Sequence, residues 1–190
     1  TTGLAKRVVI TATLVFLIGV ACAGGKAVCV NSIICSVLYR RRPDEVRPML
    51  IDPKIVELKF YNDVPHLLTP VIPAPRRAFQ ALQYCLCEME RRYALLDAQG
   101  VREIRSYNQK VAGEAAGSPI PYLVIVIDEF ADLMIQTGKE VDHALTRLGQ
   151  LARAAGIHLI MVTQRPSVDV VTGVIKANFP SRLAFQVASK

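Results

Sequence analysis

Hydrophobic positions along the chain follow two kinds of spacing. Runs of consecutive apolar residues, typical of strands buried on both faces, occur in residues 49–53, 122–127, 157–162 and 182–187. Apolar residues three and four apart, typical of helices that pack on a core, occur in residues 26–41, 79–96 and 141–155. Prolines or glycines interrupt residues 62–76 and 100–121, which we expect to be irregular segments or loops. The alternation predicts an α/β fold with a mostly parallel sheet covered by helices on both faces.

The apolar segment near the N-terminus has two interpretations. Residues 8–23 carry no charge and follow Lys6 and Arg7, and a basic stretch before an apolar one resembles a secretory signal. The segment is shorter than the ~20 residues that a membrane-spanning helix needs. Its valine, isoleucine and threonine content suits a buried strand, which we favour. We therefore assign residues 1–23 as an apolar segment, either core strand or membrane- or signal-like, and residues 24–190 as one domain.

Composition narrows the class of protein only a little. Hydrophobic residues make up 52% of the chain and charged residues 21%, which is typical of a globular protein. The net charge of +7 suits a polyanionic partner, and it suits an ordinary basic surface equally well. The 5 cysteines form no CxxC unit, so we expect reduced, apolar-packed thiols in a cytosolic protein. Because the chain starts with Thr and ends just past a strand-like run, we expect a piece of a longer protein.

Two carboxylates, Asp128 and Glu129, follow directly after the apolar run at 122–127. In open parallel sheets, ligands bind beyond the carboxyl ends of the strands. One carboxylate in such a place can hold Mg²⁺ while its neighbour orients a water molecule, so Asp128 is our candidate metal ligand and Glu129 our candidate general base. The alternative is that both are solvated acids that precede a helix whose first turn contains Asp132.

The next apolar run ends in Thr163 and Gln164, which we expect at the same edge of the sheet. A neutral amide can bond a terminal phosphate or its water without competing for Mg²⁺, so Gln164 is a candidate nucleotide sensor. The alternative is a polar cap on the strand. Upstream, Gly24, Gly25 and Lys26 stand between the apolar segment and the first helical pattern, where a phosphate-binding loop would lie.

Four long stretches of sequence carry a resemblance to a known family. They read MLIDPKIVELKFYNDVPHLLTPV, CEMERRYALLDAQGVREIRSYNQK, VIVIDEFADLM and LARAAGIHLIMVTQRPSVDVVTGVIKANFPSRLAFQVASK. From about Gly24 to Lys190 the chain closely resembles the motor domain of the FtsK/SpoIIIE DNA translocases. The resemblance implies a RecA-like P-loop NTPase fold, ATP and Mg²⁺ as cofactors, and a homo-hexameric ring that pumps double-stranded DNA. It also implies a part in chromosome partition at bacterial cell division, as the cytoplasmic motor of a protein anchored in the inner membrane through a region outside this chain.

The resemblance assigns roles to several basic residues. Two stretches, GVREIRSYN and RPSVDVVTGVIKANFP, match the central loops of the family, which implies phosphate contacts from Arg102, Arg105, Arg165 and Lys176. Such contacts are electrostatic and independent of base sequence, which a motor that moves along DNA of any sequence requires. Rings of this kind also use an arginine finger on a neighbour's ATP, for which Arg153 is our candidate. The alternative for each is a solvated surface cation.

The phosphate loop departs from the family pattern GxxxxGK[ST]. The implied ATP-binding residues are Gly24, Gly25, Lys26 and Ala27, and Lys26 is also a catalytic candidate. Val20 stands where the pattern has its first glycine, and Ala27 stands where it has the Ser or Thr whose hydroxyl binds Mg²⁺. Because the rest of the chain closely resembles the family, a DNA-dependent ATPase is our first interpretation. The alternatives are a nucleotide- and DNA-binding module without efficient hydrolysis, and a membrane protein anchored by residues 8–23.

Overall fold

The structure is a computed structural model that describes residues 15–19, 23–113 and 117–184 of the chain. Within these residues, all strands belong to a single sheet with the order β2-β3-β4-β1-β5. The strands are β1 (Val15–Gly19), β2 (Val46–Ile51), β3 (Tyr122–Ile127), β4 (Ile157–Thr163) and β5 (Ser181–Ala184). Every pairing between neighbouring strands is parallel. The predicted α/β class with a parallel sheet is therefore confirmed.

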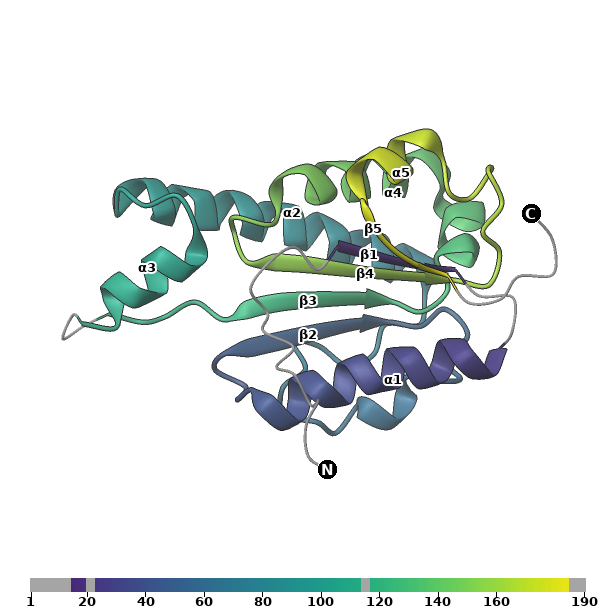
Figure 1. The fold of residues 1–190 in the computed structure, drawn as a ribbon, viewed down its shortest axis with the longest axis horizontal. Helices are drawn as coiled ribbons and strands as arrows, with labels where there is room; N and C mark the ends of the chain where they lie inside the picture. Colours follow the sequence, from purple (N-terminus) through teal and green to yellow (C-terminus); the bar gives the residue numbers. More distant parts are fainter. Residues whose placement is uncertain (1–14, 20–22, 114–116, 185–190) are drawn as a thin grey trace, which may run out of the picture.

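Helices cover both faces of the sheet, as Figure 1 shows. The helices are α1 (Ala23–Arg40), α2 (Pro75–Ala98), α3 (Ile104–Val111), α4 (Phe130–Leu151) and α5 (Gly173–Asn178), with a short 3₁₀ turn η1 (Lys59–Tyr61). Alternate residues of each strand face opposite layers: Leu123 and Ile125 of β3 pack in the core with α2 and α4, whereas Val124 and Val126 pack with α1. Burial on both faces explains why these strands are continuous apolar runs.

Part of the N-terminal apolar segment is a strand in the interior of the sheet. Val15–Gly19 forms β1, which pairs with β4 on one side and with β5 on the other. Residues 1–14 and 20–22 lie outside the described residues, so the assignment of 1–23 as a separate segment stays a prediction. In the described part of the chain, no helix is long and apolar enough to cross a membrane.

The structure differs from the expected elements mainly between β2 and β4. Residues 100–121 were expected to be a loop, but they contain α3. Its buried residues Ile104, Tyr107 and Val111 are three and four apart and pack with Leu96 and Ile120, so a short amphipathic helix forms despite its polar and glycine-containing neighbours. The helix that was expected to hold Asp132 in its first turn begins at Phe130, with Glu129 as its N-cap. The helical geometry of α4 is broken at Gly138, with φ 52° and ψ −130°, and the apolar pattern predicted from residue 141 begins after this break. Of the last predicted strand, 182–187, residues 182–184 belong to β5, and residues 185–187 lie outside the described residues.

The cysteines of the described residues are free thiols, and the expected apolar packing holds for Cys85 but not for Cys87. Cys85 is buried and Cys87 is exposed, so these two neighbours on α2 point to different environments. Burial raises the pKa of the Cys85 thiol to about 12, which keeps it protonated and unreactive. No group of three His, Cys, Asp or Glu side chains within the described ranges could hold a metal ion.

Candidate functional site

The carboxyl ends of β3 and β4 and the first turn of α1 lie at the same edge of the sheet (Figure 1). Lys26 belongs to that first turn, Asp128 and Glu129 directly follow β3, and Thr163 is the last residue of β4. Parallel strands place their carboxyl ends together, so residues far apart in the sequence meet here. The structure thus brings together Lys26, Asp128, Glu129 and Gln164, as the sequence predicts.

Lys26 and Asp128 form a buried ion pair. The Lys26 Nζ donates to Asp128 Oδ2 at 3.0 Å, and each residue is only 2% exposed. Burial raises the pKa of Asp128 to about 6, although the positive charge of Lys26 opposes the shift. Asp128 Oδ1 is buried and has no hydrogen-bond partner among the described residues. A buried carboxylate oxygen without a protein partner is a suitable ligand atom for a hard cation such as Mg²⁺.

Both carboxylate oxygens of Glu129 are hydrogen-bonded within the protein. The Thr163 hydroxyl donates to Oε1 at 2.7 Å, and the Gln164 amide donates to Oε2 at 3.1 Å. The Ala131 amide donates to Oε1 at 3.3 Å, which makes Glu129 the side-chain cap of α4. Glu129 is 1% exposed, so these bonds replace the water that an isolated carboxylate would need. The helix-capping interpretation and a role in catalysis are therefore not exclusive.

A further buried acid, Asp52, organises the loop after β2 and was not among the predicted site residues. Its carboxylate accepts hydrogen bonds from successive backbone amides of residues 54–58, at 3.0 to 3.1 Å. These bonds hold Ile55 at φ 55°, a left-handed conformation that is strained for a β-branched residue. The charges of Glu57 and Asp52 both contribute to the raised pKa of Asp128, so this loop lies beside the ion pair. The available signal was an Asp directly after the apolar run of β2.

The glycines of the phosphate loop lie inside the first turn of α1, not before it. The helix begins at Ala23, so Gly24 and Gly25 contribute amides that have no acceptor within the helix. Such amides are suited to bind phosphate oxygens. Ala27 is the next residue after Lys26 and has no side-chain oxygen, so it cannot bind a Mg²⁺ ion. Asp128 has a carboxylate that can. Val20 lies outside the described residues.

Arg153 lies at the opposite edge of the sheet. It is exposed in the turn between α4 and β4, where the amino ends of the strands meet. Burial is the main cause of the lowered pKa of His158 near the start of β4, and the positive charge of Arg153 lowers that pKa further. The structure therefore does not bring Arg153 to Lys26 within one chain, and its role as an arginine finger stays a prediction.

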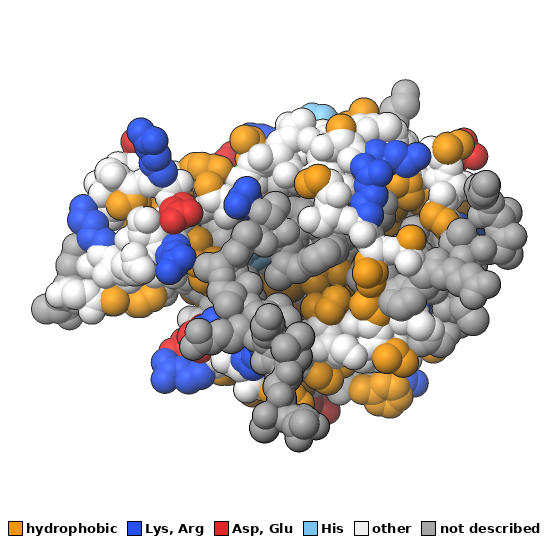
Figure 2. Space-filling view, viewed as in Figure 1, with side chains coloured by type: hydrophobic (Ala, Val, Ile, Leu, Met, Phe, Trp, Pro, Cys, Tyr) orange, Lys and Arg blue, Asp and Glu red, His pale blue; other side chains and the backbone are white. Residues whose placement is uncertain are grey.

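The candidate DNA-contacting residues lie in different parts of the fold. Arg102 and Arg105 lie at α3, which contacts the amino ends of the strands through the bond from the Ile104 amide to the Ala154 carbonyl. Arg165 directly follows the carboxyl end of β4 and Gln164, whereas Lys176 lies on α5, whose last residue packs beside Gly149 of α4. All four are exposed. Figure 2 shows basic and acidic side chains interspersed over α3, and a basic patch over α5.

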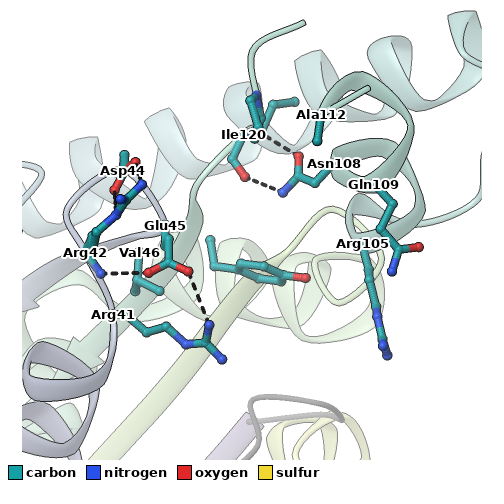
Figure 3. A pocket seen from close by; sticks show the side chains of 12 residues that line it. Arg41, Arg42, Asp44, Glu45, Val46, Arg105, Asn108, Gln109, Ala112 and Ile120 are labelled. Carbon is teal, nitrogen blue, oxygen red and sulfur yellow. Dashed lines mark hydrogen bonds and ion pairs between the residues drawn. The ribbon is translucent and has the colours of Figure 1, made fainter. Parts of the chain in front are cut away.

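Arg105 lines a cleft of about 570 Å³ between the end of α1, the start of β2 and α3 (Figure 3). Two other arginines of this cleft are neutralised: Arg41 pairs with Glu45 at 3.3 Å, and Arg42 donates to Asp44 at 3.0 Å. Beside α5, Arg182 of β5 donates to the carbonyl of Lys176 and so adds a cation next to it. Spacing along the sequence does not point to Arg182, because only the return of β5 to the sheet places it there.

The parallel sheet, the buried lysine of the first helix and the acid pair after β3 define a nucleotide-binding domain of the P-loop class. The chain belongs to the FtsK/SpoIIIE family, which matches residues 16–168. It is 60% identical over 175 residues to the DNA translocase FtsK of Treponema pallidum, and 54% identical over 179 residues to the DNA translocase SpoIIIE of Bacillus subtilis. Each match covers 92% of this chain but only 22% and 23% of the relative, so the chain spans less than a quarter of their length.

Solved structures share the fold. The conjugation coupling protein TcpA of pCW3, in a monomer form with ATPγS, is 29% identical with a TM-score of 0.76. That match covers 93% of this chain and 50% of TcpA. The cytoplasmic domain of the type VII secretion ATPase EccC from Thermomonospora curvata is 18% identical with a TM-score of 0.74, over 89% of this chain and 20% of EccC, and it shows likeness of fold alone.

Proposed function

We propose that this chain is part of the motor of an ATP-driven double-stranded DNA translocase that acts in chromosome segregation at bacterial cell division. The observation that carries the proposal is the buried cluster of Lys26, Asp128 and Glu129 at the carboxyl edge of the sheet, in a member of the FtsK/SpoIIIE family. Relatives at 60% and 54% identity are named DNA translocases. A homo-hexameric ring, and a membrane anchor outside this chain that leaves the motor in the cytoplasm, belong to the same proposal.

Each residue of the cluster has a distinct task in this proposal. Lys26 exchanges its bond with Asp128 for the terminal phosphates of ATP, which lie over the free amides of Gly24 and Gly25. Asp128 would hold Mg²⁺, and the ion would supply positive charge that offsets the charge of the phosphates. Glu129 orients the attacking water. The backbone amide of Gln164 contacts Glu129, and its side-chain amide senses the terminal phosphate.

The remaining basic residues act outside the nucleotide cluster. Arg153 faces solvent far from Lys26, so it serves the ATP of a neighbouring subunit. Arg165 contacts duplex phosphates beyond the carboxyl end of β4, and Lys176 contacts them from α5, where Arg182 adds to the positive charge. Arg102 and Arg105 are the weaker candidates, because the cleft beside Arg105 also holds Asp44 and Glu45.

One specific feature supports a second function, a nucleotide- and DNA-binding module without efficient hydrolysis. Ala27 provides no oxygen for Mg²⁺, and Val20 stands where the pattern requires glycine. Nucleotide binding through Lys26 and the amides of α1 does not depend on either position. Binding without turnover is therefore the chemistry that this chain retains if the ion cannot be held.

Mg²⁺-dependent ATP hydrolysis of the 190-residue chain, with and without linear duplex DNA, distinguishes the two functions. The translocase proposal expects hydrolysis that duplex DNA stimulates, and that Glu129→Gln abolishes while nucleotide binding persists. A matched variant, Glu140→Gln on the exposed part of α4, should hydrolyse ATP like the unmodified chain. Activity that appears only after Val20→Gly and Ala27→Ser are combined would establish the binding module instead.

A further inference from the structure

Glu129 is held by the same short segment that carries a candidate DNA contact. Two of its partners, the Thr163 hydroxyl and the Gln164 amide, belong to the end of β4 and the residue after it. Arg165 is the next residue, and it begins the exposed part of the segment between β4 and α5, which comprises residues 164–172 and is called here the β4–α5 segment.

Thr163 connects the two sides of this arrangement through one oxygen atom. Its hydroxyl accepts a hydrogen bond from the Arg165 amide at 3.0 Å and donates one to Glu129 Oε1 at 2.7 Å. The direction of both bonds is fixed, since an amide only donates and a carboxylate only accepts. Thr163 is 0% exposed, so no water competes for its hydroxyl, and the two bonds strengthen each other in a low-dielectric site.

The beginning of the β4–α5 segment is more exposed than its end. Residues 165–169 are exposed and form no helix or strand, whereas Val170 and Val171 are buried and their amides bond the Ser167 carbonyl. A polyanion bound at Arg165 therefore acts on the exposed part of the segment. Displacement of the Arg165 amide changes the bond that it donates to Thr163, and thereby the bond from Thr163 to Glu129.

We propose that Thr163 is a positioning residue whose hydroxyl couples duplex DNA bound at the β4–α5 segment to the carboxylate of Glu129. The inference rests on the proposed function, because it takes duplex DNA as the ligand and Glu129 as the group that orients water. In the structure, Glu129 Oε1 accepts from the Thr163 hydroxyl and the Ala131 amide, and Oε2 accepts from the backbone amide of Gln164. DNA at Arg165 loosens the Thr163 bond and makes one lone pair of Oε1 available for the water.

The experiment compares Thr163→Val, which removes the hydroxyl with little change of shape, with Thr163→Ser, which keeps it. Thr137→Val is the matched control, since Thr137 bonds the Leu133 carbonyl of α4 and does not contact Glu129. The measured quantity is the ratio of kcat with saturating linear duplex to kcat without it. Thr163→Val should lower this ratio by about 5-fold or more while the KM for ATP is retained, and Thr163→Ser and Thr137→Val should keep it.

A second readout does not need hydrolysis. Hydrogen exchange of the peptide that contains Glu129 and the Ala131 amide is measured with and without the same duplex. The duplex should accelerate exchange there in the unmodified chain and in Thr163→Ser, but not in Thr163→Val, with thermal unfolding used to verify that the variants fold.

The outcomes separate the two claims. A chain that hydrolyses no ATP with duplex DNA overturns the proposed function, and the exchange experiment then decides the coupling alone. Equal stimulation in Thr163→Val and the unmodified chain overturns the coupling. The absence of any duplex-dependent exchange at Glu129 in the unmodified chain overturns it as well.

Discussion

The two edges of the sheet both bury charged side chains, but they satisfy them differently. At the amino edge, the Arg92 guanidinium donates to the carbonyls of Pro121 and Ala155 and to the Glu88 carboxylate, at 2.8 to 2.9 Å. At the carboxyl edge, Asp128 has one oxygen paired with Lys26 and the other without a partner among the described residues.

The difference separates a structural charge from a reactive one. Arg92 links the chain just before β3 to the chain just before β4, and its donors are used within the protein, so it stabilises the fold. Asp128 keeps an unsatisfied oxygen and a raised pKa, which costs stability unless a ligand binds. We therefore expect substitutions at the amino edge to affect folding and those at the carboxyl edge to affect ligand binding.

Arg92→Met should have the largest effect on stability. It removes the donors of buried carbonyls and of Glu88, so we expect a loss of about 3–5 kcal/mol in the free energy of unfolding. Arg91→Met is the matched control, because Arg91 pairs with the same Glu88 but its side chain is 56% exposed; its cost should be below about 1 kcal/mol. Urea unfolding followed by circular dichroism measures both. Equal losses in the free energy of unfolding for the two variants would contradict a stabilising role for Arg92.

His158 gives the amino edge a dependence on pH. Burial lowers its pKa to about 4 from an ordinary 6.5, and neither ring nitrogen has a hydrogen-bond partner among the described residues. Between these values the unfolded chain binds a proton that the folded chain does not, so the free energy of unfolding should fall as pH decreases from 6.5 to 4. The loss approaches about 3–3.5 kcal/mol once the pH is below both values.

The variant His158→Phe preserves stacking on Tyr122 and should remove this loss. His143→Phe, on the exposed face of α4, should leave it unchanged. Unfolding measured at intervals from pH 7 to pH 4 tests the difference between the two variants. The same pH dependence in all three proteins would place the titrating group elsewhere.

Lys26→Met should cost about 1–3 kcal/mol at pH 7, because it leaves the Asp128 carboxylate buried without a counter-charge. The raised pKa of Asp128 means that its contribution to stability is fully present below its unfolded pKa and is lost as pH rises through about 6. Without Lys26 that pKa rises further, so the cost should be smaller at pH 5, where Asp128 is protonated. Lys54→Met, which breaks an exposed pair with Asp132 at the same edge, is the control, and it should show no such pH dependence.

The smallest expected effect concerns DNA. Arg165→Gln should weaken duplex binding a few-fold and reduce the slope of log affinity against log salt by about 0.9, as for one lost phosphate contact. Arg105→Gln should change the slope less, since the acids Asp44 and Glu45 lie in the same cleft. Fluorescence anisotropy at several salt concentrations compares the two variants. A larger change for Arg105→Gln would move the DNA contact to the amino edge.

The sequence by itself determined the fold class and the chemical centre of the site. Apolar runs required strands buried on both faces, and the acids Asp128 and Glu129 and the lysine Lys26 stood where such strands end or where the next helix begins. These inferences depend on local order along the chain, which the sequence displays directly. The helix α3 was missed because its apolar face is short and only becomes stable against Leu96 and Ile120.

Only the tertiary structure decided which charges are satisfied and by what. Spacing along the sequence could not show that Asp52 binds the amides of its own loop or that Thr163 joins Glu129 to Arg165. It also could not show that Arg153 lies at the edge opposite Lys26. The physical reason is that a hydrogen bond needs its two heavy atoms about 3 Å apart, and only folding sets that separation between residues distant in the sequence. Sequence order fixes which residues each strand delivers, whereas the packed sheet fixes which atoms meet.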